Sequence, residues 1–338
     1  MDSIKNIIVI GASAGGFKAI INLVSKIPSH LPTAVFVVLH LSKESMVEVL
    51  QHHMEKYTSL KCCVPQDMEV IKRGYVYIAP TDRHMLLKKG LIRITKGPHE
   101  NRWRPSIDVL FRSAAVSYNS HVVGIVLTGM LYDGTAGMSA IKRSGGITIV
   151  QEPSEAEFPD MPTSVINNVP VDYRVHIGDI GYILDDIFSK SIHNKQIPED
   201  VLIEAEITEK MVSSIDALEK IAQQSIYACP QCGGGLWKIN NDPTHRYRCH
   251  TGHTFNEKVL LESQAESVEE SIWVSVRMLE ERKKLLRTIA EHDHESGDTE
   301  LETINTARAD MIETHITRLK LAVVALHSDG TIAQDDVA

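Results

Sequence analysis

Short runs of aliphatic and β-branched residues alternate with amphipathic stretches up to about residue 190. The continuous apolar runs predict buried strands at 6–11, 33–39, 61–64, 75–78, 122–128 and 147–151. Apolar residues three and four positions apart predict helices at 15–27, 43–56, 106–118, 135–144 and 179–189. This alternation is typical of an α/β domain over residues 1–190, a doubly wound and mostly parallel sheet in three α/β/α layers. Lys88-Lys89-Gly90 lies between two apolar runs and predicts one antiparallel hairpin.

The pattern changes after residue 190. Residues 191–227 are charged and carry only short apolar spacings, such as 211–222, so they are expected to form a linker with short helices. Residues 228–255 gather cysteines and glycines and predict a small separate module. Over 256–330, two apolar stripes flank a charged segment that contains a glycine, which predicts a helical hairpin. Whether these stripes pack only against each other or also form a homo-oligomer seam stays open.

The first strand ends on a serine that is flanked by glycines. Gly11, Gly15 and Gly16 allow a sharp turn around Ser13, which lies just before the first helix. Such a turn suits either a serine nucleophile or a loop that binds a nucleotide. The glycine spacing is G-x-x-x-G-G and not G-x-G-x-x-G, and the second strand ends in His40 where a dinucleotide site needs an acidic residue. Both observations favour the catalytic serine.

A third strand end supplies a carboxylate. The apolar run 122–128 is followed by a short loop that contains Asp133. Because the carboxyl ends of parallel strands lie at one edge of a sheet, Ser13, His40 and Asp133 are expected to converge there. Together they would form a nucleophile, a general base and an orienting carboxylate. Their order along the chain differs from that of the α/β-hydrolases, so membership of that fold is not expected.

Five separated motifs resemble the CheB family of chemotaxis protein-glutamate methylesterases. In chain order they are GASAGG at 11–16, His40, APTDRHM at 79–85, NRWRPSIDVLF at 101–111 and TGMLYDG at 128–134. The resemblance covers about residues 5–190. The chain begins directly on the catalytic strand, so it resembles a standalone form in which the receiver domain, and with it control by phosphorylation in cis, is absent.

The resemblance implies an activity and roles for particular residues. Ser13, His40 and Asp133 would form the triad of a serine hydrolase that demethylates glutamyl methyl esters on chemoreceptors, releases methanol and also deamidates receptor glutamines. The backbone amide of Met130, beside Gly129, would stabilise the oxyanion, and catalysis would need no cofactor. Two other classes remain as alternatives: a non-catalytic regulatory or docking module of a signalling complex, and a dinucleotide-dependent oxidoreductase.

Two arginines precede the third predicted helix, which begins near Pro105. Arg102 and Arg104 are expected on a loop, where a guanidinium group can pair with acidic groups of a receptor or hold a substrate carbonyl. Structural ion pairs explain them equally well. The sequence leaves both interpretations open.

The cysteines of the third segment have the spacing of a zinc ribbon. Cys229 and Cys232 form one C-x2-C knuckle, and Cys249 begins a second one. The fourth ligand is expected to be His253, because a C-x3-H spacing leaves room for a turn, and less so His250, which is adjacent to Cys249. Standalone relatives often carry such a module, and four protein ligands indicate a structural zinc. The esterase domain is expected to stay active without it.

The composition limits the classes of partner that the chain is expected to bind. Among 338 residues, 35 Lys and Arg against 44 Asp and Glu give a net charge of -9, which argues against nucleic acid as the main partner. No stretch approaches the ~20 apolar residues of a membrane helix, and no targeting segment is evident. We therefore expect a cytoplasmic enzyme that acts on a methylated chemoreceptor or a related signalling protein.

Overall fold

The computed structural model describes residues 4–211, 214–242 and 244–328. The chain divides into two compact units, residues 1–259 and 260–338. The first contains the predicted α/β domain and also the cysteine-containing module, and the second consists of helices. The last two residues of the hairpin predicted at 256–330 lie outside the described residues.

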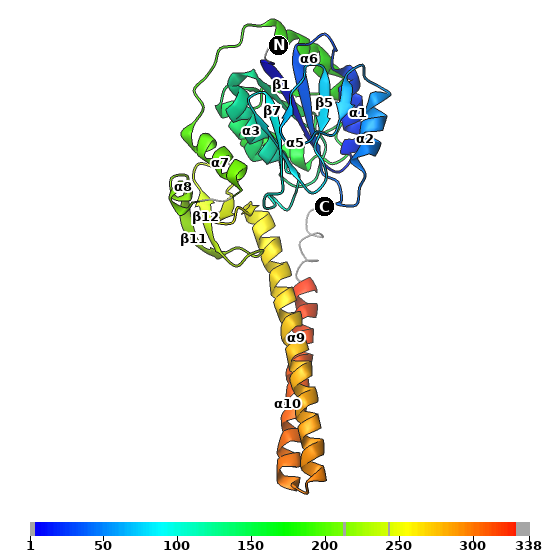
Figure 1. Cartoon of the computed structure of the whole chain (residues 1–338), viewed down its shortest axis with the longest axis vertical. Coiled ribbons are helices and arrows are strands. Elements are labelled where there is room, and N and C mark those ends of the chain that lie inside the picture. The colour runs from blue at the N-terminus through cyan, green and yellow to red at the C-terminus, as the bar shows by residue number, and fades with distance from the viewer. Residues whose placement is uncertain (1–3, 212–213, 243, 329–338) are drawn as a thin grey trace. The chain divides into compact units, whose positions relative to one another are not determined.

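A seven-stranded sheet forms the centre of the first unit (Figure 1). Its strands are all parallel, in the order β10-β9-β8-β1-β2-β5-β3. They are β1 (Asn6–Ala12), β2 (Thr33–Leu39), β3 (Lys61–Cys63), β5 (Tyr75–Ile78), β8 (Val122–Val126), β9 (Ile147–Gln151) and β10 (Tyr173–Val175). The central β1 pairs with β2 on one side and β8 on the other, so the strand order reverses there, and α/β sheets commonly bind their ligands at the carboxyl end of such a reversal.

Helices cover both faces of this sheet, which confirms the three-layer prediction. One face carries α1 (Gly16–Lys26), α2 (Val47–Glu55) and α6 (Ile177–Ser189), and the other carries α3 (Ile107–Tyr118), α4 (Thr135–Arg143) and α5 (Asp160–Asn168). The predicted hairpin is also present, as β6 (His84–Lys88) and β7 (Leu91–Thr95), with β4 (Glu69–Val70) added at its edge. The sequence pattern did not predict α5 or β10, because both are short and largely polar.

The segment expected to be a linker is mostly regular structure. Within it lie α7 (Glu199–Lys210), α8 (Ile215–Glu219) and β11 (Ala222–Ala228). The helix expected at 211–222 is therefore confined to α8, because Met211 ends α7 with a left-handed φ of 59° and a strand begins at Ala222. The module thus starts at 222 and not at 228. Its antiparallel sheet continues with β12 (Gly235–Ile239), β13 (Tyr247–Cys249) and β14 (Thr254–Phe255).

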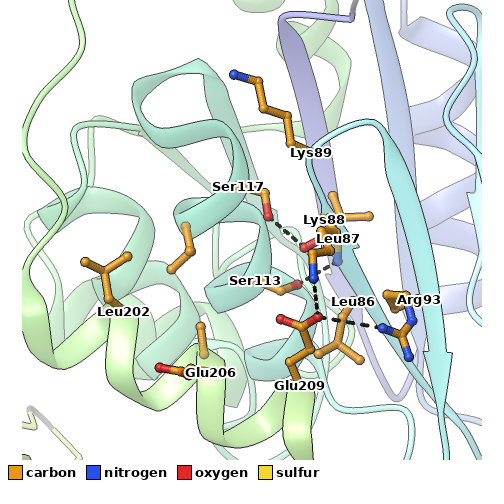
Figure 2. Close-up of a pocket in the computed structure, with 12 residues that line it drawn as sticks. Leu86, Leu87, Lys88, Lys89, Arg93, Ser113, Ser117, Leu202, Glu206 and Glu209 are labelled. Atoms are coloured by element: carbon orange, nitrogen blue, oxygen red, sulfur yellow. Dashed lines mark hydrogen bonds and ion pairs between the residues drawn. The ribbon is translucent and has the colours of Figure 1, made fainter. Parts of the chain in front are cut away.

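Tertiary contacts explain why α7 is not a flexible linker. Its Val201 joins the core beneath α3. Glu209 pairs with Lys88 of β6 at 2.7 Å and with Arg93 of β7 at 3.6 Å, beside a cavity of about 550 Å³ between α7, α3 and the hairpin (Figure 2). Since these partners lie over a hundred residues away in sequence, the local charge pattern could not indicate the contact.

The second unit is built from α9 (Glu257–Glu295) and α10 (Thr299–Ser328), joined through Gly297 at a φ of 81°. Val276 of α9 packs against Ile312 and Ile316 of α10. Lys283 pairs with Glu313 at 2.6 Å, and other pairs follow the same antiparallel order. The predicted helical hairpin is confirmed. Among the described residues, no helix combines the length and the apolar character that crossing a bilayer demands.

Candidate active site

The three residues predicted to converge lie together at the carboxyl edge of the parallel sheet. Ser13 follows β1, His40 follows β2, and Asp133 lies in the loop after β8. His40 Nδ1 is 3.2 Å from Ser13 Oγ, and His40 Nε2 is 2.9 Å from Asp133 Oδ2. When Nε2 carries its hydrogen and donates it to the carboxylate, Nδ1 is free to accept the Ser13 proton.

The Ser13 turn is fixed by backbone hydrogen bonds. The Ser13 amide donates to Thr128 O at 3.0 Å, and the Gly16 amide donates back to Ser13 O at 2.8 Å. Gly15 has a φ of 71°, a conformation that favours glycine. The nucleophile therefore stands on a tight, immobilised turn directly before α1.

Asp133 is buried against the N-terminus of α3. Besides His40, its carboxylate accepts hydrogen bonds from the Ile107 amide at 2.7 Å, Ser106 Oγ at 3.0 Å and Asn101 Nδ2 at 3.2 Å. Burial alone would raise the pKa of Asp133, but the hydrogen bond and charge of His40 and these donors outweigh burial and lower it. The carboxylate thus stays ionised and holds the Nε2–H of His40.

A second carboxyl group lies next to Asp133. Asp108 accepts hydrogen bonds from the Gly137 amide at 2.6 Å and from Asn101 Nδ2 at 2.9 Å. Burial and the neighbouring negative charge of Asp133 raise the pKa of Asp108 well above its ordinary value. One carboxyl of the pair is therefore ionised and the other neutral.

Two residues of this site were not identified from the sequence. The Trp103 ring stacks on the His40 ring, with centroids 4.0 Å apart and planes 8° apart, and Asn101 binds both carboxyl groups. The available signal was an aromatic residue between two arginines on a loop, but the sequence interpretation considered only the charges. Stacking of this kind fixes the orientation of the imidazole ring.

The two arginines differ in their contacts. Arg104 donates to Asp82 Oδ1 at 3.0 Å and to Gly97 O at 2.8 Å, and its hydrogen bond lowers the pKa of Asp82 to about 2. Of the two interpretations left open, Arg104 thus takes the structural ion pair. Arg102 lies beside Trp103 with a left-handed φ of 68°.

The two predicted oxyanion residues also differ. The Gly129 amide donates to Phe158 O at 2.9 Å, so it is already engaged, and the amide donor expected at this site remains that of Met130. Gly129 instead provides space, since a Cβ there would lie 2.8 Å from Ser13 Cβ. The amide of Met130 makes no backbone hydrogen bond to another described residue, and Met130 is 49% exposed.

The four predicted metal ligands form a cluster at the end of the antiparallel sheet. Ligand atoms of Cys229, Cys232, Cys249 and His253 all lie within 4.8 Å of one another. Cys232 Sγ is 3.7 Å from Cys249 Sγ, and His253 Nδ1 is 3.7 Å from Cys229 Sγ and 3.5 Å from Cys249 Sγ. The exposed His250 is not part of this cluster.

Comparison with known proteins agrees with this geometry. The family model described as CheB methylesterase matches residues 8–184, a region that contains the whole Ser13, His40 and Asp133 arrangement. The chain belongs to the CheB methylesterase family. A Leptospira interrogans member, named a protein-glutamate methylesterase/protein-glutamine glutaminase, is 38% identical over 174 residues, which span 51% of this chain and 90% of the relative.

Other members of the CheB family show similar agreement. A Salmonella typhi enzyme with the same designation is 37% identical over 169 residues, and the match spans 49% of this chain and 48% of that protein. The solved structure of the Thermotoga maritima CheB methylesterase catalytic domain superimposes with a TM-score of 0.52 at 30% identity, over 54% of this chain and 98% of that domain. The family likeness thus covers the α/β domain.

Proposed function

We propose that this chain is a protein-glutamate methylesterase that demethylates glutamyl methyl esters on chemoreceptors or related signalling proteins, and that it also deamidates receptor glutamines. The observation that carries the proposal is His40, held between Ser13 Oγ and the ionised Asp133. Relatives that match this region are named for both activities. A non-catalytic docking module would not require this arrangement.

The geometry supports a two-step acyl transfer. Ser13 Oγ attacks the ester carbonyl while His40 Nδ1 takes the hydroxyl proton, and the Met130 amide is the proposed donor to the oxyanion. Collapse breaks the carbonyl–methoxy bond, and His40 returns the proton to release methanol. Water then attacks the acyl-enzyme with the same base, freeing the glutamate carboxylate and Ser13. With a glutamine substrate, the leaving group is ammonia.

Methanol release from methylated receptor membranes tests this function. Ser13→Ala should abolish turnover and labelling by a serine-reactive phosphonate, because loss of a triad nucleophile commonly costs about 10³-fold or more. Ser25→Ala is the matched control, since Ser25 is exposed on α1 and its hydroxyl donates to Asn22 O. A Ser13→Ala rate within about tenfold of wild type would exclude the triad.

We also propose that Cys229, Cys232, Cys249 and His253 hold one structural zinc. Tetrahedral bonds of about 2.3 Å to sulfur and about 2.05 Å to nitrogen place sulfur atoms about 3.8 Å apart and sulfur and nitrogen about 3.6 Å apart. Three of the separations in the cluster, at 3.5–3.7 Å, fit these values. Four protein ligands leave no position for a reacting water, so no catalytic step involves the ion.

The helical unit is proposed to join two copies of the chain in the cytoplasm. Apolar side chains remain exposed along both helices, including Trp273, Met278, Leu285, Met311, Leu321 and Val324. A second copy offers the same stripes and would cover them in a four-helix bundle. Light scattering should give a dimer mass for the wild type and a monomer mass for Met278→Glu with Leu285→Glu. A wild-type monomer at micromolar concentration would refute the dimer.

A further inference from the structure

The loop at 99–103 makes direct contact with the catalytic residues. Trp103 stacks on His40, and Asn101 donates to Asp133 Oδ1 at 3.2 Å. Both Asn101 and Arg102 have left-handed φ values, 51° and 68°. Such conformations in residues other than glycine persist only where surrounding contacts impose them. The contacts that hold this loop therefore bear on the geometry of the triad.

The backbone contacts of this loop with a neighbouring strand come from the cysteine-containing module. The Asn101 amide donates to Thr254 O at 2.9 Å, the Thr254 amide donates to His99 O at 3.4 Å, and Glu100 forms a parallel bridge with Thr254. The loop is in effect an added strand beside β14. These backbone bonds link residues about 150 positions apart within one compact unit.

A buried ion cluster strengthens the same connection. Glu100 accepts from Arg112 of α3 at 2.8 Å and from Arg248 of β13 at 3.2 Å, and all three side chains are 2% exposed. Burial alone would raise the pKa of Glu100, but the two guanidinium charges outweigh it and lower that pKa. Loss of Arg248 would remove one of the two cations that offset the burial of Glu100, and would therefore destabilise the loop.

The proposed metal ligands occupy the neighbouring positions in sequence. Cys249 directly follows Arg248, and His253 directly precedes Thr254. The Cys249 amide also donates to His253 O at 3.0 Å, which closes the turn between β13 and β14. An ion that joins Cys249 and His253 to the first knuckle thus fixes the two residues that hold the loop.

We propose that the metal-closed module acts as a clamp that positions the 99–103 loop, and through it His40 and Asp133, so that occupancy of the metal site controls the esterase rate. Asn101 and Trp103 are positioning residues in this scheme, and the ion touches no reacting atom. The proposal rests on the proposed function and modifies the expectation that the esterase domain works independently of the module.

Cys232→Ser in the full chain tests the clamp. Cys232 is an exposed ligand of the first knuckle, far in sequence from the loop and from the strands that hold it. We expect loss of about one zinc per chain, retained far-ultraviolet circular dichroism of the parallel sheet, and faster hydrogen exchange in a peptide that covers 98–106. With p-nitrophenyl acetate, kcat should fall at least about tenfold, because the stack on His40 and the hydrogen bond to Asp133 are lost together.

Two further measurements separate a clamp from general destabilisation. Trp103→Ala should lower kcat without loss of zinc, and adding Cys232→Ser to it should lower kcat by much less than the product of the two single effects, since both act through one loop. Zinc returned to chelator-treated wild type should restore both the rate and the exchange protection. Glu209→Gln, which removes only the partly exposed pairs of α7 in Figure 2, is the control and should keep the wild-type rate.

The outcomes are distinct. Zinc-free Cys232→Ser with a wild-type rate would overturn the clamp while leaving the esterase intact, as would multiplicative effects in the double variant. Collapse of the parallel sheet on metal loss would also overturn it, because the ion would then support the whole fold and not the loop. Failure of the proposed function appears separately, as Ser13→Ala protein that still hydrolyses the ester.

Discussion

Asp133→Asn examines how the surroundings of the carboxylate select the tautomer of His40. An amide in this position has one oxygen and one NH2 group, and it can turn either one toward His40. The Oδ2 position faces two N–H donors, His40 Nε2–H and the Ile107 amide at 2.7 Å. Neither can become an acceptor while His40 keeps its active tautomer, so an NH2 group there would oppose both.

The Oδ1 position is more tolerant. It faces the Ser106 hydroxyl, which can accept a hydrogen bond, and the Asn101 side chain, which can turn its amide oxygen inward. Only the Asp108 amide, at 3.3 Å, would remain opposite a donor. We therefore expect the introduced NH2 group to occupy this position, so that the oxygen still faces His40 and the active tautomer is preserved.

The loss in rate then reflects only the missing charge. A hydrogen bond to a charged partner contributes about 1.5–3 kcal/mol and a neutral one about 0.5–1.5 kcal/mol. The difference, about 1–2 kcal/mol, applies when His40 becomes an imidazolium in the transition state, and it corresponds to a fall of about 5- to 30-fold in kcat. A reversed tautomer costs about 10⁴-fold in a serine protease triad.

Steady-state kcat values of the wild type and Asp133→Asn, measured with p-nitrophenyl acetate and with methylated receptor, distinguish a loss of about 5- to 30-fold from one of about 10⁴-fold. Asp133→Ala is the comparison, because it leaves the donors of His40, Ile107 and Ser106 without their acceptor at a cost of about 1–3 kcal/mol each. It should therefore lower the free energy of unfolding by several kcal/mol, whereas Asp133→Asn should not. A loss near 10⁴-fold in Asp133→Asn, with unchanged stability, would refute the reasoning about the amide orientation.

Two other substitutions test the carboxyl pair and the nucleophile turn. The raised pKa of Asp108 means that the folded protein keeps the Asp108 proton at pH values where the unfolded chain has released it, above the ordinary pKa of about 3.9. The protonated Asp108 therefore makes its full contribution to stability below that ordinary pKa. The contribution is lost as the pH rises through the pKa of Asp108 in the folded state. Asp108→Asn mimics the neutral acid, so urea titrations from acid to neutral pH should lack that decline; an unchanged pH profile would show that Asp108 is already ionised. Gly129→Ala would place a Cβ 2.8 Å from Ser13 Cβ. We therefore expect kcat to fall at least about tenfold, which is the size of effect that a small displacement of catalytic groups causes. A wild-type rate would mean that the turn accommodates the methyl group without moving Ser13.

The sequence by itself determined the sheet and the three catalytic candidates. Short continuous apolar runs rich in β-branched residues are typical of buried strands of a covered sheet, and the polar residues that follow parallel strands meet at its carboxyl edge. Ser13, His40 and Asp133 were found for this reason. Cysteine spacing likewise indicated the proposed metal ligands, because a C-x2-C knuckle constrains geometry locally.

Tertiary structure decided what lies around those residues. Trp103 meets His40, Asn101 meets Thr254, and the Gly129 amide meets Phe158 O through contacts between distant segments that leave no periodic signal. The same holds for α7, whose charged residues suggested a linker, because the partners of Glu209 lie on the distant β6–β7 hairpin. Local pattern fixes where a strand begins and ends, but long-range pairing fixes which polar groups remain free, and that pairing places the module in the same compact unit as the catalytic residues.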